Sequence, residues 1–510
     1  MKAEDIVAAA TQDWARSDAA GGAIALFEGG RVTRGWCIGL ADIESRRGWT
    51  LDTPTRLASL SKHVTAAAVF AHGLDTARSL GSWLPELEGA VAASTLGRAL
   101  TMTSGIPDLA ETLGLAGVPG SPPFDAERLH RLSCRITHLN FAPGEEVSYS
   151  NTGFRLAQRV VERAGGCDLA AWLAGEVFAP LGLSSFALVE DQSVVVLGLA
   201  SGYWHADGQP RRGQYGLHYS GSGGMVASVA DMVRWVDALL SGRGPLAGLQ
   251  ARLVEPGRLA TGAPVGYAHG LMLHRIGTTD LVGHGGSLPG YKNHFVVDPR
   301  TGRGAIVMSN REETQAQALA LALLAAELGI AHAPQTPAAC PVGAFVDAAT
   351  GDVLELAAGP SGPTANFLGS EERIFVGEDG VWASAAPHFP IRIRPAAVDA
   401  EALQASVGGA AERTWLRADG AAWPVRPGLY RCAELDATHE IAIADGASYV
   451  RWGHCAAPAA WQPLRPLRDG SHATATPPNG PWRQRPVLRF AEESFVLSSN
   501  RSRRWRFARV

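Results

Sequence analysis

Ser59 and Lys62 stand three positions apart in the stretch TRLASLSKHVTAAAVF, residues 55–70. On a helix, this spacing places two side chains on one face, with Cβ atoms about 5–6 Å apart. A serine hydroxyl needs a base to become a nucleophile, and a neutral lysine amine supplies one. Burial, or the positive potential of a helix N-terminus, lowers the pKa of such an amine. The pair therefore predicts a catalytic site with Ser59 as nucleophile and Lys62 as its base.

The lysine at position 62 is unusual for this chain, because 45 residues are basic and only Lys2, Lys62 and Lys292 are lysines. Arginine stays protonated in proteins and cannot serve as the base. The alternative is a chance match on a surface helix. The apolar flanks argue for a buried site instead: Leu57, Ala58, Leu60, Val64 and Ala67.

A second polar group, Tyr149 and Asn151 in the motif YSN, follows a Pro-Gly turn. A tyrosine held near a lysine can share protons with the serine and the leaving group. We expect Asn151 to hydrogen-bond Lys62 and the substrate amide. The YxN pattern recurs at residues 291–293, so an ordinary turn tyrosine is the alternative.

A third group is the HGG motif at residues 284–286, the only HxG in the chain. We expect it on a strand that borders a cleft, where Gly286 lets the substrate backbone approach closely. The backbone N–H of Ser287 would then join that of Ser59 as an oxyanion hole. The alternatives are a core histidine at His284 and a turn at the glycines.

The elements that must hold these groups predict an α+β domain, with strands at both ends and helices between them. The hairpin at 23–40 turns at Gly29-Gly30. Ser228 is the expected N-cap of one helix, with Asp231 three residues later. The predicted helices cover 59–73, 153–165, 228–241 and 314–329, and the later strands lie within 266–276 and 294–310.

The character of the sequence changes after a Pro/Ala-rich linker at 331–341. Short strand-like runs alternate with Gly, Pro and Asp, and no amphipathic helix is apparent, which is typical of small antiparallel barrels or sandwiches. A further boundary falls near 423–430. The expected domains are a catalytic domain at 1–332, a β-barrel domain B at 341–422 and a β-barrel domain C at 426–510.

Composition excludes several classes. The chain has 510 residues, a net charge of −4 and a pI near 6.4, which argues against nucleic-acid binding. The N-terminus lacks a secretory h-region, and the most apolar run, 318–326, is too short to span a membrane. No zinc spacing is present, so we expect no metal and no cofactor. Scattered cysteines favour a reduced, cytoplasmic protein: Cys37, Cys134, Cys167, Cys340, Cys432 and Cys455.

Taken together, SLSK, YSN and HGG, in this order and spacing, resemble the serine β-lactamase and penicillin-binding-protein superfamily over roughly residues 1–332. Supporting segments are LTMTSGIPD (100–108), FAPLGL (178–183), GSGGMVASVADMVRW (221–235) and VGYAHGLML (265–273). The full chain resembles the D-stereospecific aminopeptidase family. The implied fold is a multi-domain α+β protein: a β-lactamase/transpeptidase-like catalytic domain followed by two small antiparallel β-barrels.

This resemblance implies that Ser59 is acylated by a substrate with a free N-terminal D-residue. Lys62 and Tyr149 would handle the protons, while Asn151 and His284 would shape the site. The expected partners are small D-amino-acid amides, esters or peptides, with no nucleic acid and no membrane, and the resemblance also implies a homodimer.

In that family, a loop of the last barrel reaches the active site, and the corresponding segment here is 472–484. Its Pro-Pro and Asn-Gly pairs favour a stiff turn. The expected substrate-binding residues of this loop are Pro477, Asn479 and Gly480. A plain barrel loop is the alternative.

One departure from the family pattern concerns the substrate ammonium. An acidic residue is expected just before the prolines, where this chain has Ala475 and Thr476. An unpaired buried ammonium is costly, so another acid must serve or specificity has drifted. The candidates are Asp469, Glu145 and Glu146.

Other functions remain open at this point. The first is a β-lactamase-like esterase or amidase, or a D,D-carboxypeptidase. The second is a receptor that binds D-peptides or penicillin without turnover. Hydrolysis of D-alanyl, L-alanyl and N-acylated substrates separates these possibilities.

Overall fold

A six-stranded antiparallel sheet forms the centre of the N-terminal part of the chain, in the order β10-β11-β12-β13-β1-β2. Strand β1 lies between β13 and β2, so the two ends of this region meet in one sheet. The computed structural model describes residues 2–16, 18–118, 124–330, 340–359, 362–377, 379–421, 423–453, 460–474 and 485–510. The strands are β1 (Gly22–Glu28), β2 (Arg31–Ile38), β10 (Met272–Ile276), β11 (Thr279–Leu288), β12 (Tyr291–Val297) and β13 (Arg303–Ser309).

Helices cover both faces of this sheet, because alternate residues of its central strands point to opposite sides. In β1, Ile24 and Leu26 pack with α1 and α12, whereas Ala25 and Phe27 pack with α2 and α10. The helices are α1 (Ala3–Ala10), α2 (Ser61–Ala71), α3 (Leu80–Trp83), α4 (Gly89–Ala93), α5 (Leu96–Leu100), α6 (Leu109–Leu115), α7 (Ala126–Cys134), α8 (Asn151–Gly165), α9 (Leu169–Trp172), α10 (Val229–Ser241), α11 (Gln250–Leu253) and α12 (Ala316–Glu327).

Local sequence explains where several helices begin and end. The Ser228 side chain accepts a hydrogen bond from the backbone N–H of Asp231, which confirms the expected N-cap of α10. Gly166 and Gly242 end α8 and α10 in the left-handed conformation that glycine adopts easily. Other short elements are β3 (Leu40–Asp42), β4 (Arg47–Gly48), β5 (Thr55–Arg56), β6 (Ala187–Leu188), β7 (Tyr203–Ala206), β8 (Gln209–Arg212), β9 (Met225–Ala227), the 3₁₀-helices Ala58–Leu60 and Gly244–Leu246, and the π-helix Leu173–Phe178.

Two sequence expectations need correction here. Ser59 lies in the 3₁₀-turn Ala58–Leu60, and α2 begins only at Ser61, so the Ser-x-x-Lys pair spans a helix start. The strand expected over 266–276 is confined to β10. The preceding segment turns at Gly270, where φ is +78° and an added Cβ would lie 2.6 Å from the backbone of α2.

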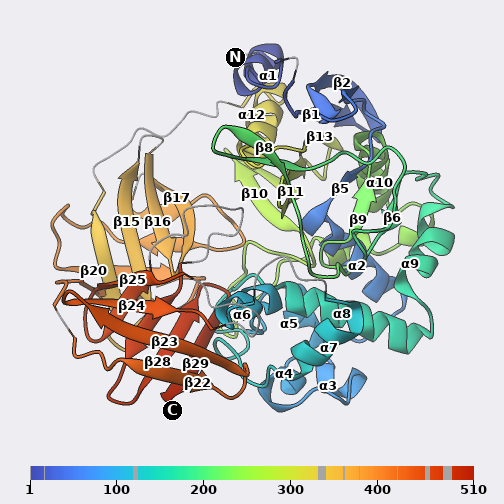
Figure 1. Cartoon of the computed structure of the whole chain (residues 1–510). Coiled ribbons are helices and arrows are strands. Elements are labelled where there is room, and N and C mark those ends of the chain that lie inside the picture. The colour runs from blue at the N-terminus through green and yellow to red at the C-terminus, as the bar shows by residue number, and fades with distance from the viewer. Residues whose placement is uncertain are drawn as a thin grey trace.

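Two closed antiparallel barrels of eight strands each form the C-terminal part, which confirms the expected architecture. They lie beside each other in Figure 1, with the second barrel against α6. The first contains β14 (Gly343–Asp347), β15 (Val353–Gly359), β16 (Gly362–Phe367), β17 (Ser370–Val376), β18 (Trp382–Ser384), β19 (Ile391–Ile393), β20 (Ala402–Val407) and β21 (Arg413–Arg417). The second contains β22 (Gly428–Cys432), β23 (Ala437–Ala444), β24 (Ala447–Arg451), β25 (Gln462–Pro466), β26 (Ser471–Thr474), β27 (Val487–Phe490), β28 (Ser494–Ser499) and β29 (Ser502–Arg509).

The second barrel docks on the helical region through the β28–β29 hairpin. Ser502 Oγ lies 2.7 Å from Thr112 Oγ1 of α6. Arg503 donates to Glu146 at 2.6 Å, and both side chains are almost fully buried. A buried charge is costly without a partner, so this pair favours the one docked position of the second barrel in which both charges are paired. Arg503 also donates its backbone N–H to the Asn140 side chain at 2.8 Å.

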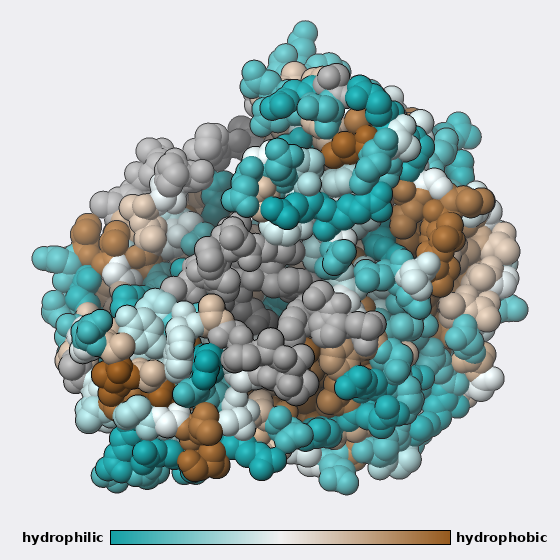
Figure 2. Space-filling view, in the orientation of Figure 1, coloured by the Kyte–Doolittle hydropathy of each residue, from teal (hydrophilic) through white to brown (hydrophobic). Residues whose placement is uncertain are grey.

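The outer surface is predominantly hydrophilic on the face shown in Figure 2, with apolar atoms in separate groups. Exposed apolar side chains include Val195 and Leu197, in the loop before β7. No helix within the described ranges is long and apolar enough to cross a membrane.

Candidate active site

Ser59 is held at a strained point of the backbone. The preceding residue, Ala58, has φ of +53°, a left-handed value that is uncommon for a residue with a Cβ. Strained residues persist only where the surrounding structure enforces them, and they cluster at functional sites. The turn is fixed by the backbone N–H of Leu57, which donates to the Met225 carbonyl of β9 at 2.9 Å. Ser59 therefore enters the cavity from a rigid turn at the start of α2.

Lys62 contacts Ser59 directly. Its Nζ atom lies 3.0 Å from Ser59 Oγ, and it donates to Asn151 Oδ1 and to the Ser222 carbonyl, each at 2.7 Å. The side chain is fully buried. Burial lowers the pKa of Lys62 well below its usual value, the charge of Asp108 opposes this, and the charge of Arg501 lowers the pKa further. These conditions favour a neutral amine that can accept the serine proton.

Asn151, the first residue of α8, is held in one orientation by Asp108. Asp108 Oδ2 accepts hydrogen bonds from the backbone N–H and the side-chain amide of Asn151, at 2.7 and 2.8 Å. Its Oδ1 atom accepts from the backbone N–H of Glu111, which makes Asp108 the N-cap of α6. Because the amide nitrogen of Asn151 is engaged, its oxygen faces Lys62. Asp108 ends the segment LTMTSGIPD, in which no local pattern predicts this role.

Tyr149 lies between the Lys62 amine and the Arg501 guanidinium. Lys62 Nζ and the guanidinium carbon of Arg501 each lie 4.8 Å from the centre of its ring. Burial raises the pKa of the Tyr149 phenol, while the hydrogen bond with Ser59 and the charge of Arg501 act in the opposite direction. The phenol is therefore protonated at neutral pH and placed to pass a proton near Ser59.

His284 supports this group from β11. Its Nδ1 atom lies 2.5 Å from the Gly285 carbonyl and its Nε2 atom lies 2.9 Å from the hydroxyl of Tyr267. The ring centre lies 6.3 Å from that of Tyr149. Burial lowers the pKa of His284 well below its usual value, and the charge of Lys62 lowers it further. His284 is a neutral, buried neighbour of Tyr149 and is not among the residues that line the cavity.

Gly286 of the HGG motif allows β11 to lie close to the Ser59 turn. A Cβ at this position would sit 2.2 Å from the Leu57 carbonyl oxygen, so only glycine lets β11 approach the Ser59 turn. The next residue, Ser287, lines the same cavity. Its Oγ atom accepts a hydrogen bond from Lys292 at 2.6 Å, and Lys292 pairs with Glu312 at 2.7 Å.

A cavity of about 570 Å³ opens over Ser59 and draws residues from all three parts of the chain. The catalytic region contributes the lining described above, together with Glu111. The first barrel contributes His388, whose ring centre lies 5.7 Å from that of Tyr149. The second barrel contributes Arg501, at the tip of the β28–β29 hairpin. Sequence reasoning missed Glu111, His388 and Arg501.

The acids proposed for the substrate ammonium lie elsewhere. Glu146 is buried against Arg503, and none of Glu145, Glu146 and Asp469 lines the cavity. Glu145 pairs with Arg413, and Asp469 with Arg468. The candidate loop residues Pro477, Asn479 and Gly480 lie outside the described residues.

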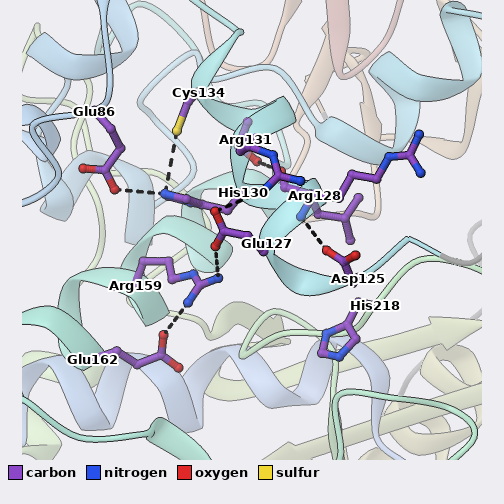
Figure 3. A network of polar contacts seen from close by, with 12 residues as sticks. Glu86, Asp125, Glu127, Arg128, His130, Arg131, Cys134, Arg159, Glu162 and His218 are labelled. Atoms are coloured by element: carbon purple, nitrogen blue, oxygen red, sulfur yellow. Dashed lines mark hydrogen bonds and ion pairs between the residues drawn. The ribbon is translucent and has the colours of Figure 1, made fainter.

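A second polar network, drawn in Figure 3, joins α7 and α8. His130 Nε2 lies 2.9 Å from Glu86 and 3.7 Å from the Cys134 sulfur. Arg159 bridges Glu127 and Glu162, at 3.5 and 3.3 Å. Burial raises the pKa of Cys134 to about 11, which leaves its thiol protonated and unreactive. The network pairs its charges internally, and across the described ranges no group of His, Cys, Asp and Glu could hold a metal ion.

A buried serine–lysine pair, a protonated tyrosine and an antiparallel sheet covered by helices define a serine hydrolase of the β-lactamase type. The chain belongs to the beta-lactamase family, whose model matches residues 6–329.

The similarity to known proteins extends beyond residues 6–329. A D-aminopeptidase of Brucella melitensis biotype 2 is 32% identical over 381 residues, which covers 71% of each chain. A D-aminopeptidase of Cereibacter sphaeroides is 29% identical over 379 residues, covering 71% of this chain and 70% of its own.

Solved structures share the fold. An octameric penicillin-binding protein homologue from Pyrococcus abyssi covers 99% of this chain and 100% of its own, at 17% identity and a TM-score of 0.57. A D-amino acid amidase from Ochrobactrum anthropi SV3 covers 64% of this chain and 99% of its own, at 22% identity and a TM-score of 0.53.

Proposed function

We propose that this enzyme releases N-terminal D-amino acids, such as D-alanine, from small peptides, amides and esters through an acyl-enzyme on Ser59. The chain is a hydrolase that acts on D-residues, as its D-aminopeptidase relatives support. The observation that carries the mechanism is the 3.0 Å contact between Lys62 Nζ and Ser59 Oγ in a fully buried setting.

In the proposed first step, neutral Lys62 takes the proton of Ser59 while Oγ attacks the substrate carbonyl carbon. The backbone N–H groups of Ser59 and Ser287 would stabilise the oxyanion that forms. Tyr149 would pass a proton to the leaving amine, and the C–N bond breaks to leave an ester on Ser59. Lys62 then passes the proton it took from Ser59 to the Tyr149 oxygen, so both groups regain their starting states. Water attacks the ester carbonyl carbon, the bond to Ser59 Oγ breaks, and the proton lost by water passes to Oγ as the D-amino acid leaves.

Glu111 is the acid that we propose for the substrate ammonium. It lines the cavity, and its Oε2 atom accepts hydrogen bonds from Ser499 Oγ at 2.6 Å and from the Arg501 backbone at 2.8 Å. Its Oε1 atom has Arg501 Nε at 3.8 Å as its nearest charged partner. Burial raises the pKa of Glu111, so a bound ammonium would restore its ionised form.

The test compares D-Ala-p-nitroanilide with the L-substrate and with an N-acetylated D-substrate. We expect hydrolysis of the first at least tenfold faster than of either control. Equal rates on the L-substrate would contradict the proposal, and a preference for the N-acylated substrate would indicate a D,D-carboxypeptidase-like activity. Ser59→Ala must abolish turnover, because it removes the nucleophile.

The homodimer and the cytoplasmic location stay predictions. Size-exclusion chromatography with light scattering measures the number of chains in the assembly, and cell fractionation measures the compartment.

A further inference from the structure

The backbone of Arg501 is fixed on the start of α6. Its carbonyl oxygen accepts hydrogen bonds from the backbone N–H of Asp108 at 2.8 Å and from Asn140 Nδ2 at 3.0 Å. Its own N–H donates to Glu111 Oε2 at 2.8 Å. Two of these hydrogen bonds join Arg501 to the α6 start, where Asp108 orients Asn151, and the third joins it to Asn140 in the loop after α7. The hairpin tip cannot move without disturbing the catalytic group.

The side chain of Arg501 enters the cavity over Tyr149. Its guanidinium carbon lies 4.8 Å from the ring centre, a distance at which a cation is attracted to the ring face. The nearest carboxylate oxygen, Glu111 Oε1, is 3.8 Å from Nε, beyond hydrogen-bond distance. None of the hydrogen bonds between described residues uses its Nη atoms. The charge is thus held in place mainly by the backbone and by Tyr149.

Charged and titratable groups from each element that packs around Arg501 surround its guanidinium. Two acids of the α6 segment, Asp108 and Glu111, act on Arg501, and so does Glu372 of β17. Burial raises the pKa of Glu372 to about 7, and Arg501 opposes that rise. The remaining groups are Lys62 of α2, His284 of β11 and His388 of the first barrel.

We propose that Arg501 is a positioning residue for proton transfer at Ser59: the second barrel places its cation over Tyr149, where it holds the phenol ring and repels a proton on Lys62. The proposal rests on the acyl-enzyme mechanism above and extends it, because it makes the docked barrel part of the catalytic site. A catalytic region without the barrel would keep the Ser59–Lys62 pair and lose this cation.

Electrostatics agree with the geometry. Burial is the main cause of the lowered pKa of Lys62, and Arg501 acts in the same direction while Asp108 opposes it. Arg501 also opposes the rise that burial causes in the pKa of Tyr149. The first influence favours the neutral form of Lys62 that accepts the serine proton, and the second makes the Tyr149 phenol a stronger acid, as a proton donor to the leaving amine requires. Without the cation, Lys62 would hold its proton to a higher pH.

The test measures kcat/KM against pH for Arg501→Gln, Arg501→Lys and a matched control, Arg504→Gln. Arg504 lies on the same hairpin, is exposed and is absent from the cavity lining. We expect the acidic limb of the profile to move to higher pH by about one unit in Arg501→Gln, since loss of one nearby charge shifts a pKa by this order. Arg501→Lys should restore most of the wild-type profile, and Arg504→Gln should leave it unchanged.

Two measurements keep the test decisive. Labelling of Ser59 by a fluorophosphonate, followed by mass spectrometry over the same pH range, reports serine activation even where turnover is too slow to measure. An equal loss of kcat/KM at every pH, with the acidic limb at its wild-type position, would overturn the proposal. Arg501 would then be a purely structural residue. A second substrate, p-nitrophenyl acetate, separates the proposed role of Arg501 from the proposed D-aminopeptidase activity. The acidic limb of the pH profile can be measured with this ester even if D-alanyl compounds are not hydrolysed.

Discussion

The Oδ1 atom of Asn151 lies 2.7 Å from the Nζ atom of Lys62. This contact is possible in one amide orientation only, because Asp108 holds the Asn151 nitrogen and the backbone N–H beside it. Asp108 also caps α6 and receives the second barrel through the Arg501 carbonyl. One residue therefore connects Asn151 and Lys62, through its carboxylate, with a helix start and, through its backbone N–H, with the docked second barrel.

Replacing Asp108 with Asn tests this connection. Asparagine offers one acceptor oxygen where Asp108 uses two, so it cannot accept from Asn151 and from the Glu111 N–H together. We therefore expect kcat/KM to fall about 100-fold through misplacement of the reacting groups. Because the charge of Asp108 raises the pKa of Lys62, its removal should move the acidic limb of the pH–rate profile to lower pH. This direction is opposite to that expected for Arg501→Gln. A limb that moves to higher pH in Asp108→Asn would contradict the assignment.

Lys62→Arg should abolish activity even though the positive charge is kept. Arginine cannot release its proton, so the base is lost, and general-base catalysis contributes about 100-fold to 10,000-fold. The measurement is single-turnover acylation of Ser59 with D-Ala-p-nitroanilide. Lys2→Arg is the matched control, since Lys2 is exposed at the start of α1 and is absent from the cavity lining. Turnover of Lys62→Arg at the rate of the control would show that another group is the base.

Gly286→Ala should disrupt the site through the backbone. The added methyl would meet the Leu57 carbonyl oxygen at 2.2 Å, so β11 must move away from the Ser59 turn. Such overpacking costs about 1–3 kcal/mol of stability, and the displaced Ser287 N–H can no longer face the oxyanion. Thermal melting and kcat together measure both effects. Gly48→Ala meets no heavy atom within 4 Å and serves as the control. Wild-type kcat in Gly286→Ala would refute the close approach.

Stability should fall in mild acid because His63 is buried without charge. Burial lowers its pKa from 6.5 to about 3, and its Nε2 atom accepts a hydrogen bond from Trp235 at 2.7 Å. The folded-state pKa lies below the unfolded one, so the unfolded chain binds the extra proton between these values. Stability is therefore complete above pH 6.5 and falls by about 1.4 kcal/mol per pH unit below it.

His63→Gln keeps an acceptor for Trp235 and cannot ionise. Urea unfolding at about pH 7.5 and about pH 5 should show a pH dependence that is smaller than that of the wild type by about 2 kcal/mol. An equal pH dependence in the two proteins would mean that His63 is not responsible for the acid sensitivity.

Much of the site could be read from local patterns. The Ser59–Lys62 spacing, the YSN turn and the HGG strand each lie within one short segment, and the structure brings all three to one cavity. Periodicity also gave the element types, because a half-buried strand such as β29 alternates apolar and polar residues and a helix start such as Ser228 carries its own cap. The position of Ser59 in a 3₁₀-turn was missed, since hydrophobic spacing does not distinguish a tight first turn from the α-helix that follows.

The sequence by itself determined the chemistry: a serine with a lysine that arginine cannot replace, and a glycine where β11 needs one. Only the tertiary structure decided which side chains surround that chemistry. Glu111, His388 and Arg501 belong to three different parts of the chain and carry no motif. Their meeting depends on how two barrels dock on a helix start, through long-range hydrogen bonds and one buried ion pair. Such contacts form between segments far apart in sequence, so no local spacing records them.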